Sequence, residues 1–405
     1  MKPETKKKLG LVLRLGVSIA LMAYVFYTIP FLDHLQLADG TEVKGEIVNR
    51  DVNLDDPEAT VRMWIAGEER SFKVAQVVRD EKGAVTGLAW GFWPIVRHTD
   101  KPLFAGSFCL MLACVFITSY RWCELLKVQG IEMSHWRAAR LTWVGMFYNN
   151  VLPGLTGGDL VKMYAAARDT PKKTEAVVSV MVDRLLGIFV LGLIAAVVVL
   201  LRIDDPQFRR MAVYIYAFVA AGVLGTVVIM SRRIRRALRL PYLVGKLPFG
   251  EFLKNVDRAV FLYRTKKKVM AEAFALSVAN HLVIITAVFG FGRAIGISRA
   301  GYVDYLVFFP VASIISAIPI NVGGWGVGEM LFKGLFGRVG VSASKAVALS
   351  VLYRLSMNVF VSLPGAFLMP GKKLASAEEM EEEVQRDLET APETPTETTD
   401  DPPAE

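Results

Sequence analysis

The sequence contains few of the residues from which metal sites and disulfide frameworks are built. Its three cysteines and four histidines are scattered, and neither set has the spacing of a metal site or a disulfide framework. It also lacks a nucleotide-binding motif and any pairing of a nucleophile with a base. Charged residues make up only 21% of the chain, whereas 53% is hydrophobic and forms long blocks. We therefore expect no metal and no cofactor, and the blocks exclude a wholly soluble protein.

Six of the apolar blocks are long enough to cross a bilayer, which takes about 20 residues of helix. They are residues 9–29, 103–120, 176–201, 211–230, 269–291 and 346–369. Two further blocks, 139–167 and 302–337, are apolar but interrupted by proline and glycine. The first run follows three lysines and has no signal-peptide cleavage site after it, so we expect a retained anchor. The predicted fold class is an all-α polytopic membrane protein.

Two polar segments lie outside these blocks. Residues 31–100 carry 13 acidic and 8 basic residues, and their short alternating runs between turn signals predict a small β-rich insert of four or five strands. We interpret the insert as an accessory or docking module with a protein partner. Residues 374–405 are rich in Glu, Pro and Thr and are expected to be a disordered acidic tail. The predicted division is an anchor at 1–30, the insert at 31–100, a membrane domain at 101–373 and the tail at 374–405.

The distribution of basic residues predicts the topology. The basic N-terminus, the strongly basic segment 231–268 and the end of the last span should all be cytoplasmic, which places the acidic insert outside. All of these positions are satisfied together if the six clear runs cross the membrane while each interrupted block enters and leaves it on the same side. If both interrupted blocks crossed fully, segment 231–268 would be outside. The rule therefore favours two re-entrant hairpins. The basic membrane body suits anionic lipid, and nucleic acid is the less favoured partner.

The two interrupted blocks share the pattern Pro-x-x-x-Gly-Gly. The residues are Pro153, Gly157 and Gly158 in the first and Pro319, Gly323 and Gly324 in the second. Each block precedes a span with an internal arginine, so residues 139–201 and 302–369 form a predicted inverted repeat. Proline and paired glycines favour unwound turns, and such backbone is tolerated at membrane depth only inside protein or beside a polar cavity. The alternative is that they only kink ordinary membrane helices.

Six ionisable residues lie in or beside the predicted spans, where an isolated charge costs at least a few kcal/mol. They are Asp159, Lys162, Asp183, Arg184, Glu329 and Arg354. In one interpretation the three cations hold a phosphate-bearing headgroup, and the carboxylates orient them or bind coupling protons. In the other, ion pairs join the two repeats without touching a ligand.

These motifs carry a family resemblance. They read Asn150-x-x-Pro153-x-x-x-Gly157-Gly158-Asp159, then Asp183-Arg184, then Gly323-Gly324-x-Gly326-x-x-Glu329. The pattern resembles the flippase-like transmembrane family named after lysylphosphatidylglycerol synthase, over roughly residues 103–369 and the first span. The resemblance implies a bacterial-type inner (plasma) membrane location and marks Asp159, Arg184 and Glu329 as motif positions. Lys162 stands where we expect an arginine, which keeps the charge but loses bidentate geometry.

In the two-domain synthases of this family, the membrane domain is associated with moving aminoacylated phosphatidylglycerol between leaflets. No soluble aminoacyl-transferase domain follows the last span here, so we expect no synthase activity. The leading hypothesis is a flippase or transporter of an anionic, phosphate-bearing lipid or lipid-linked precursor. The alternatives are an intramembrane enzyme that modifies lipid headgroups and a non-transporting scaffold.

Overall fold

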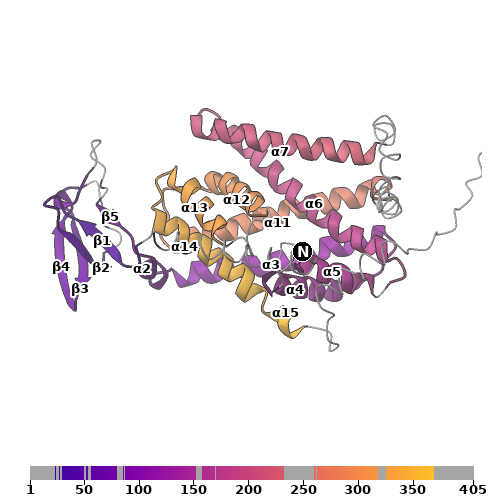
Figure 1. Cartoon of the computed structure of the whole chain (residues 1–405), viewed down its shortest axis with the longest axis horizontal. Helices are drawn as coiled ribbons and strands as arrows, with labels where there is room; N and C mark the ends of the chain where they lie inside the picture. The colour runs from indigo at the N-terminus through magenta and orange to yellow at the C-terminus, as the bar shows by residue number, and fades with distance from the viewer. Residues whose placement is uncertain are drawn as a thin grey trace, which may run out of the picture.

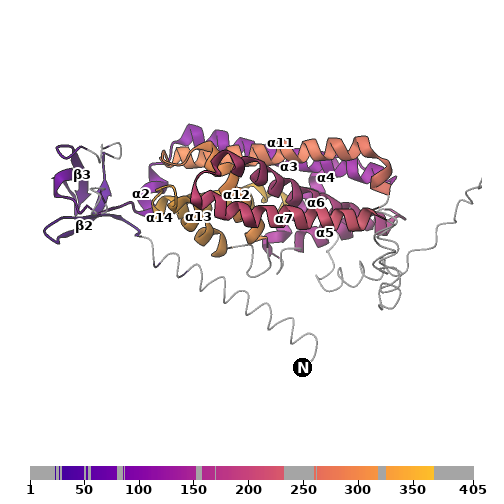
Figure 2. The ribbon, with the colours of Figure 1, turned by 90° about the horizontal axis from the view of Figure 1, so that it is seen from above.

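The computed structural model shows an elongated helical body with a β-sheet at one end (Figures 1 and 2). It describes residues 30–49, 56–79, 87–151, 157–168, 170–231, 262–317 and 325–368, with the single positions 23, 27, 52, 85 and 260. The first predicted span and the acidic tail therefore lie outside the described residues.

The body is built around two long antiparallel helices, α3 (Lys101–Val128) and α11 (Lys267–Ala294). The Asp100 side chain caps α3 by accepting from the Leu103 N–H, and the Asp100 N–H donates to the carbonyl of Ala294 at 2.9 Å. We call this the sheet end of the body. At the other end, which we call the distal end, the hydroxyl of Tyr263 donates to the Leu125 carbonyl.

Five helical segments are long and apolar enough to cross a membrane: Lys101–Val128, Lys173–Arg202, Phe208–Val228, Lys267–Ala294 and Ala343–Phe367. They coincide with five of the six predicted spans, so the prediction of a mainly helical polytopic membrane protein is confirmed. They contain α3, α6 (Lys173–Val198), α7 (Pro206–Met230), α11 and α14 (Ala343–Arg354). A π-helical turn, Leu355–Val361, leads from α14 towards α15 (Pro364–Phe367). Helix α7 exposes Tyr214 and Leu224, as expected of a helix that faces lipid.

Each interrupted block folds as two helices that pack against each other. The first consists of α4 (His135–Val151) and α5 (Gly157–Ala167), and the backbones approach closely where Gly158 meets Gly145. The second consists of α12 (Tyr302–Ser316) and α13 (Val327–Gly337), with the rings of Tyr305 and Phe336 4.8 Å apart. In both pairs the chain reverses between the helices. Pro153, Pro319, Gly323 and Gly324 lie in the connections, outside the described residues.

The two pairs are attached to opposite ends of the body. Helix α4 starts beside the end of α3, where the rings of His135 and Tyr120 are 4.9 Å apart. After α5, the Lys172 ammonium returns to the carbonyl of Gln129 at the distal end. By contrast, α12 starts at the sheet end, where the hydroxyls of Tyr302 and Thr286 are 2.8 Å apart.

The insert is a five-stranded antiparallel sheet with the order β4-β3-β2-β1-β5. Its strands are β1 (Asp33–Gln36), β2 (Glu42–Ile47), β3 (Thr60–Ile65), β4 (Glu68–Lys73) and β5 (Leu88–Ala89). Alternating residues of β1, β2 and β3 bury one face of the sheet, including Leu35, Ile47 and Val61. The short helix α2 (Phe92–Arg97) joins the sheet to α3.

Candidate functional site

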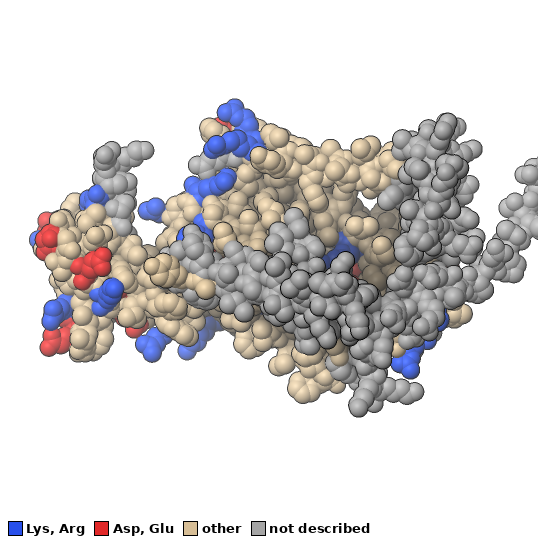
Figure 3. Space-filling view, viewed as in Figure 1, with Lys and Arg blue, Asp and Glu red and all other residues tan. Residues whose placement is uncertain are grey.

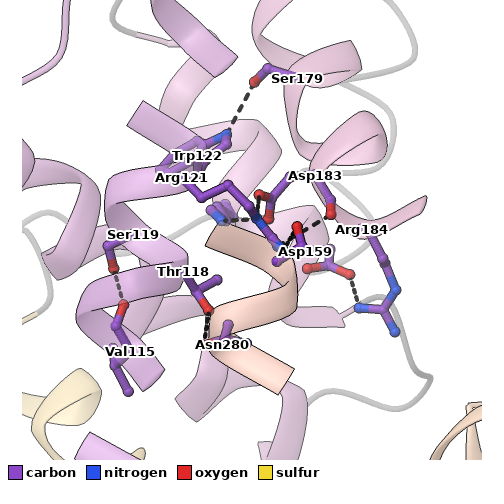
Figure 4. Close-up of polar contacts among 12 residues, drawn as sticks. Val115, Thr118, Ser119, Arg121, Trp122, Asp159, Ser179, Asp183, Arg184 and Asn280 are labelled. Carbon is purple, nitrogen blue, oxygen red and sulfur yellow. Dashed lines mark hydrogen bonds and ion pairs between the residues drawn. The ribbon is translucent and has the colours of Figure 1, made fainter. Parts of the chain in front are cut away.

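Figure 4 shows Arg121, Asp159, Asp183 and Arg184 close together inside the body. With Lys162 they make five charged side chains from three helices that meet there. We call them the first charged cluster, which consists of Arg121, Asp159, Lys162, Asp183 and Arg184. Arg121 belongs to α3, Asp159 and Lys162 to α5, and the other two to α6. Four of the five were predicted as site residues from the sequence.

The centre of the first charged cluster is a buried ion pair between Arg121 and Asp183. The guanidinium Nε lies 2.8 Å from the carboxylate Oδ1, and the two side chains are 6% and 8% exposed. The guanidinium also donates to the hydroxyl of Ser277 at 2.6 Å and to the backbone carbonyl of Asp183 at 3.3 Å. The pair therefore joins α3, α6 and α11 and orients both charges rigidly.

Lys162 is a second buried cation beside the same carboxylate. Its ammonium lies 3.8 Å from the other carboxylate oxygen of Asp183 and 3.9 Å from the centre of the Trp122 ring. The indole N–H of Trp122 is fixed in turn by the hydroxyl of Ser179 at 3.1 Å. Asp183 thus lies between two cations, and an aromatic ring supports the second through a cation–π contact.

Arg184 lies on a more open side of the cluster, where it forms an ion pair with Asp159. Its side chain is 35% exposed, and its α6 neighbours Met181 and Leu185 are exposed apolar residues. In Figure 3 a hollow in the apolar face of the body shows basic and acidic atoms at its base. The partial exposure of Arg184 and the exposed apolar residues beside it place this pair near the apolar surface of the body.

The N-terminus of α5 is held by Asn149. Its side-chain oxygen accepts from the Gly158 N–H at 2.9 Å, which satisfies one of the free donors at a helix start. The sequence motif pointed instead to the adjacent Asn150, a helical residue whose side chain lies outside the described part of the structure.

A second charged cluster forms where α13 starts, from Glu329, Arg354 and Ser350. Glu329 is fully buried, accepts from the Gly326 N–H at 2.6 Å and from the Ser350 hydroxyl at 3.2 Å, and lies 3.2 Å from the guanidinium Nε of Arg354. A Cβ on Gly328 would overlap that guanidinium, so the glycine makes room for the arginine. Arg354 also reaches the hydroxyl of Ser316 at the end of α12.

The two clusters have the same arrangement of carboxylate and arginine. In each, a carboxylate in the first turn of the helix after the interruption pairs with an arginine 25 residues later, Asp159 with Arg184 and Glu329 with Arg354. The six charges singled out in the sequence are thus arranged as ion pairs in two places. The clusters differ in charge, because the first contains three cations and two carboxylates whereas the second contains one of each.

The sequence analysis missed Arg121. The predicted span 103–120 stops one residue before Arg121, whereas α3 continues for two more turns and buries this residue. The tryptophan next to it, Trp122, was the available signal, since an aromatic residue beside an arginine extends the apolar pattern across the charge.

The described residues contain no group of three or more histidine, cysteine, aspartate or glutamate side chains arranged to hold a metal ion. The polar groups of the two charged clusters are cations, carboxylates and hydroxyls. Such groups recognise anions and protons.

Taken together, the helices and the charged clusters define a multi-pass membrane protein with ion pairs inside its helical body. The family model for the lysylphosphatidylglycerol synthase TM region matches residues 85–365, and the chain belongs to this family. Its relatives include a "UPF0104 membrane protein" of Methanothermobacter thermautotrophicus, 24% identical over 319 residues that cover 72% of this chain and 90% of that protein. Another, from Pyrococcus horikoshii, is 24% identical over 329 residues, covering 71% and 94%. The resemblance predicted from the sequence is confirmed.

Proposed function

We propose that this protein is a lipid flippase, a transporter that moves an anionic, phosphate-bearing lipid or lipid-linked precursor between the leaflets of the inner (plasma) membrane. The observation that carries the proposal is the first charged cluster, which holds three cations and two carboxylates within an apolar body. Charges at membrane depth are costly, and they are found mainly along substrate or ion pathways.

The charge of the first cluster suits a singly charged headgroup. With its carboxylates ionised, the cluster has one excess positive charge, which a phosphodiester with a single negative charge would neutralise. Lys162 and Arg184 are the cations we assign to the phosphate, because Arg121 is already fixed by Asp183 and Ser277. In the second cluster, Arg354 serves the headgroup later in its passage. Asp159, Asp183 and Glu329 orient the cations or take up coupling protons.

Access from the bilayer is supported by the partial exposure of Arg184. Its side chain is 35% exposed, beside the exposed apolar residues Met181 and Leu185. A headgroup can therefore approach Arg184 from the side while its acyl chains remain in lipid. The lipid needs no water-filled tunnel wide enough for its tails.

We further propose that the α4–α5 and α12–α13 pairs are re-entrant hairpins of an inverted repeat. The proposal is supported by the reversal of the chain within each pair and by their attachment to opposite ends of the body. In this arrangement both chain termini are cytoplasmic, the insert is outside, and each cluster faces a different side. Secondary transporters use such broken helices to expose a central site alternately.

The direct test is transfer of fluorescent anionic lipid between leaflets in vesicles reconstituted with the purified protein. Wild-type protein should accelerate transfer, and Arg184→Ala and Arg354→Ala should each slow it by about tenfold or more, which corresponds to losing a charged hydrogen bond. Arg210→Ala, a change at an exposed arginine of α7 outside both clusters, serves as the matched control. Absence of protein-dependent transfer for every anionic lipid tried would refute the proposal.

The alternative of an intramembrane enzyme would use Asp159 or Glu329 as a general acid or base. It predicts a covalently altered lipid, which mass spectrometry of lipids from cells lacking or overproducing the protein would detect. The scaffold alternative makes the insert the essential part. It predicts that deletion of residues 32–90 abolishes function while Arg184→Ala does not, the reverse of the transport proposal.

A further inference from the structure

Two polar side chains face each other at the interface of α3 and α11, outside both charged clusters. The Thr118 hydroxyl donates to the side-chain oxygen of Asn280 at 3.3 Å, and Figure 4 shows the two residues beside the first charged cluster. One turn further along the same interface, Arg121 donates to the hydroxyl of Ser277. The contact between Thr118 and Asn280 is therefore displaced from the first charged cluster by about 4.5 Å along the helix axis, towards the sheet end.

The second charged cluster approaches the same interface one turn further on. The π-helical turn that follows Arg354 packs against α3, and Tyr353 lies within electrostatic range of Cys114 in α3. Cys114 is one turn from Thr118, and its thiol contacts the backbone carbonyl of Asn280 at 3.8 Å. Thr118 and Asn280, which we call the middle pair, therefore lie between the two charged clusters along α3.

The middle pair interrupts the buried contact surface of α11. Ser277 and Ile284, about one turn to either side, are buried, whereas Asn280 is only half-buried. The adjacent His281 is also half-buried, and its ring nitrogen donates to the carbonyl of Gly187 in α6 at 2.8 Å. The contact surface of α11 is therefore less tightly closed at this depth than one turn to either side.

The Asn280 amide offers two hydrogen-bond donors. Its oxygen accepts from Thr118, and neither of its N–H groups has an acceptor among the residues that the structure describes. Polar groups without partners are costly at membrane depth, and polar residues within spans mark substrate pathways. An amide N–H can donate to a phosphate oxygen without adding charge. A neutral donor suits a middle step, because a site between two charged sites must bind weakly enough to release its ligand.

We propose that the middle pair is the intermediate contact of the anionic headgroup on its way from Arg184 to Arg354. The Asn280 amide donates to the phosphate, and Thr118 is a positioning residue that orients this amide. The inference rests on the proposed lipid transport and names a substrate-binding residue that the sequence analysis did not single out. In the alternative, the two side chains only join α3 to α11, as polar residues between membrane helices often do.

The test is transfer of fluorescent phosphatidylglycerol and phosphatidylcholine between leaflets in vesicles reconstituted with full-length variants. Asn280→Leu removes both donors and should slow phosphatidylglycerol transfer by about tenfold, as expected for a lost hydrogen bond to a charged group. Asn280→Gln, which keeps the amide, and Thr118→Val, which removes only its orientation, should each slow it less. Thr226→Val removes a hydroxyl of α7 that bonds within its own helix, and it should leave the rate unchanged.

Asn280→Asp, measured at pH 8, separates headgroup contact from helix packing. Its carboxylate repels an anionic headgroup and should lower the ratio of phosphatidylglycerol to phosphatidylcholine transfer by about tenfold, whereas a packing defect would slow both lipids equally. If wild type and Asn280→Leu transfer phosphatidylglycerol equally fast, or if Asn280→Asp leaves the ratio unchanged, the inference is overturned while lipid transport stands. If wild type transfers no anionic lipid, the transport proposal itself fails and the inference fails with it.

Discussion

At the scale of single residues, Asp183 is the charge on which the first cluster depends. It touches two cations, Arg121 at 2.8 Å and Lys162 at 3.8 Å, and all three side chains are buried. Removing one member of a buried ion pair costs about 3–5 kcal/mol, because the remaining charge is left without compensation. The loss of unfolding free energy should therefore depend on how many charges each substitution leaves unpaired.

A first prediction follows from the two cations that Asp183 contacts. Asp183→Leu leaves both cations unpaired and should lower the free energy of unfolding by about 3–5 kcal/mol. Arg121→Met leaves Asp183 paired with Lys162 and should lower it by less. Reversible unfolding in mixed micelles measures both. A larger loss for Arg121→Met than for Asp183→Leu would contradict the assignment of Asp183 as the shared partner.

At the scale of helices and strands, close backbone contact positions the charges. Helix α5, which carries Asp159 and Lys162, packs tightly on α4, and Gly158 is the point of contact. A methyl group there would overlap the carbonyl of Gly145. The sequence analysis expected the glycine pair to favour an unwound turn, whereas in the structure Gly157 and Gly158 begin α5. Gly158 allows two helices to approach closely, and its partner in this contact is Gly145, 13 residues earlier. A local sequence pattern does not reveal such a partner.

The second prediction follows from this contact. Gly158→Ala should destabilise the protein by about 1–3 kcal/mol through overpacking and should slow lipid transfer, because α5 carries Asp159 and Lys162. Gly225→Ala in α7 is the matched control, since nothing lies within 4 Å of the Cβ it would add. That control should be neutral or stabilising by up to about 1 kcal/mol. Equal behaviour of the two variants in unfolding experiments would count against the close packing of α5 on α4.

The insert depends on one buried carboxylate. Asp33 is fully buried and accepts from the backbone N–H groups of Ile47 at 2.8 Å and Gly91 at 2.6 Å, which ties β1 to the end of β2 and to the start of α2. Alternation predicted the strands, but not this polar residue inside them. A lone aspartate in a strand gives no sign of which distant donors it will meet.

As a third prediction, Asp33→Ala leaves two buried donors without their acceptor and should destabilise the insert by about 2–5 kcal/mol. Asp33→Asn should cost less, since its amide oxygen still accepts. The measurement is the rate of limited trypsin cleavage after Arg62 in β3, which should rise in the order wild type, Asn, Ala. Asp39→Ala, at an exposed turn, should leave that rate unchanged. If cleavage is equally slow in all four proteins, Asp33 does not support the sheet.

At the scale of the whole molecule, sequence reasoning predicted the helical membrane class, five of the spans and the β unit, because each depends on local hydrophobic patterning. It did not predict how the charges divide. Arg121 and Asp183 are 62 residues apart, and their contact depends on how α3 and α6 cross. Contacts between helices leave no local pattern in the sequence, so the division of the charges into two clusters is found only in the folded structure.

The fourth prediction concerns the sides from which the two hairpins are reached. In a background with Cys109→Ser, Cys114→Ala and Cys123→Ala, single cysteines are placed at the corresponding positions by Leu160→Cys in α5 and Met330→Cys in α13. In sealed vesicles a membrane-impermeant maleimide should label the first from the cytoplasmic side and the second from the opposite side. Glu68→Cys in the exposed sheet reports the outer side. Labelling of both hairpin positions from one side would exclude the inverted arrangement.

The most direct test of the proposed transport is a comparison of headgroup charge in vesicles reconstituted with the wild-type protein. The excess of one positive charge in the first cluster predicts that fluorescent phosphatidylglycerol moves between leaflets at least about tenfold faster than phosphatidylcholine labelled on the same acyl chain. Protein-free vesicles of the same composition give the background rate. Equal protein-dependent rates for the two lipids, or no rate above background, would contradict a charge-selective lipid flippase.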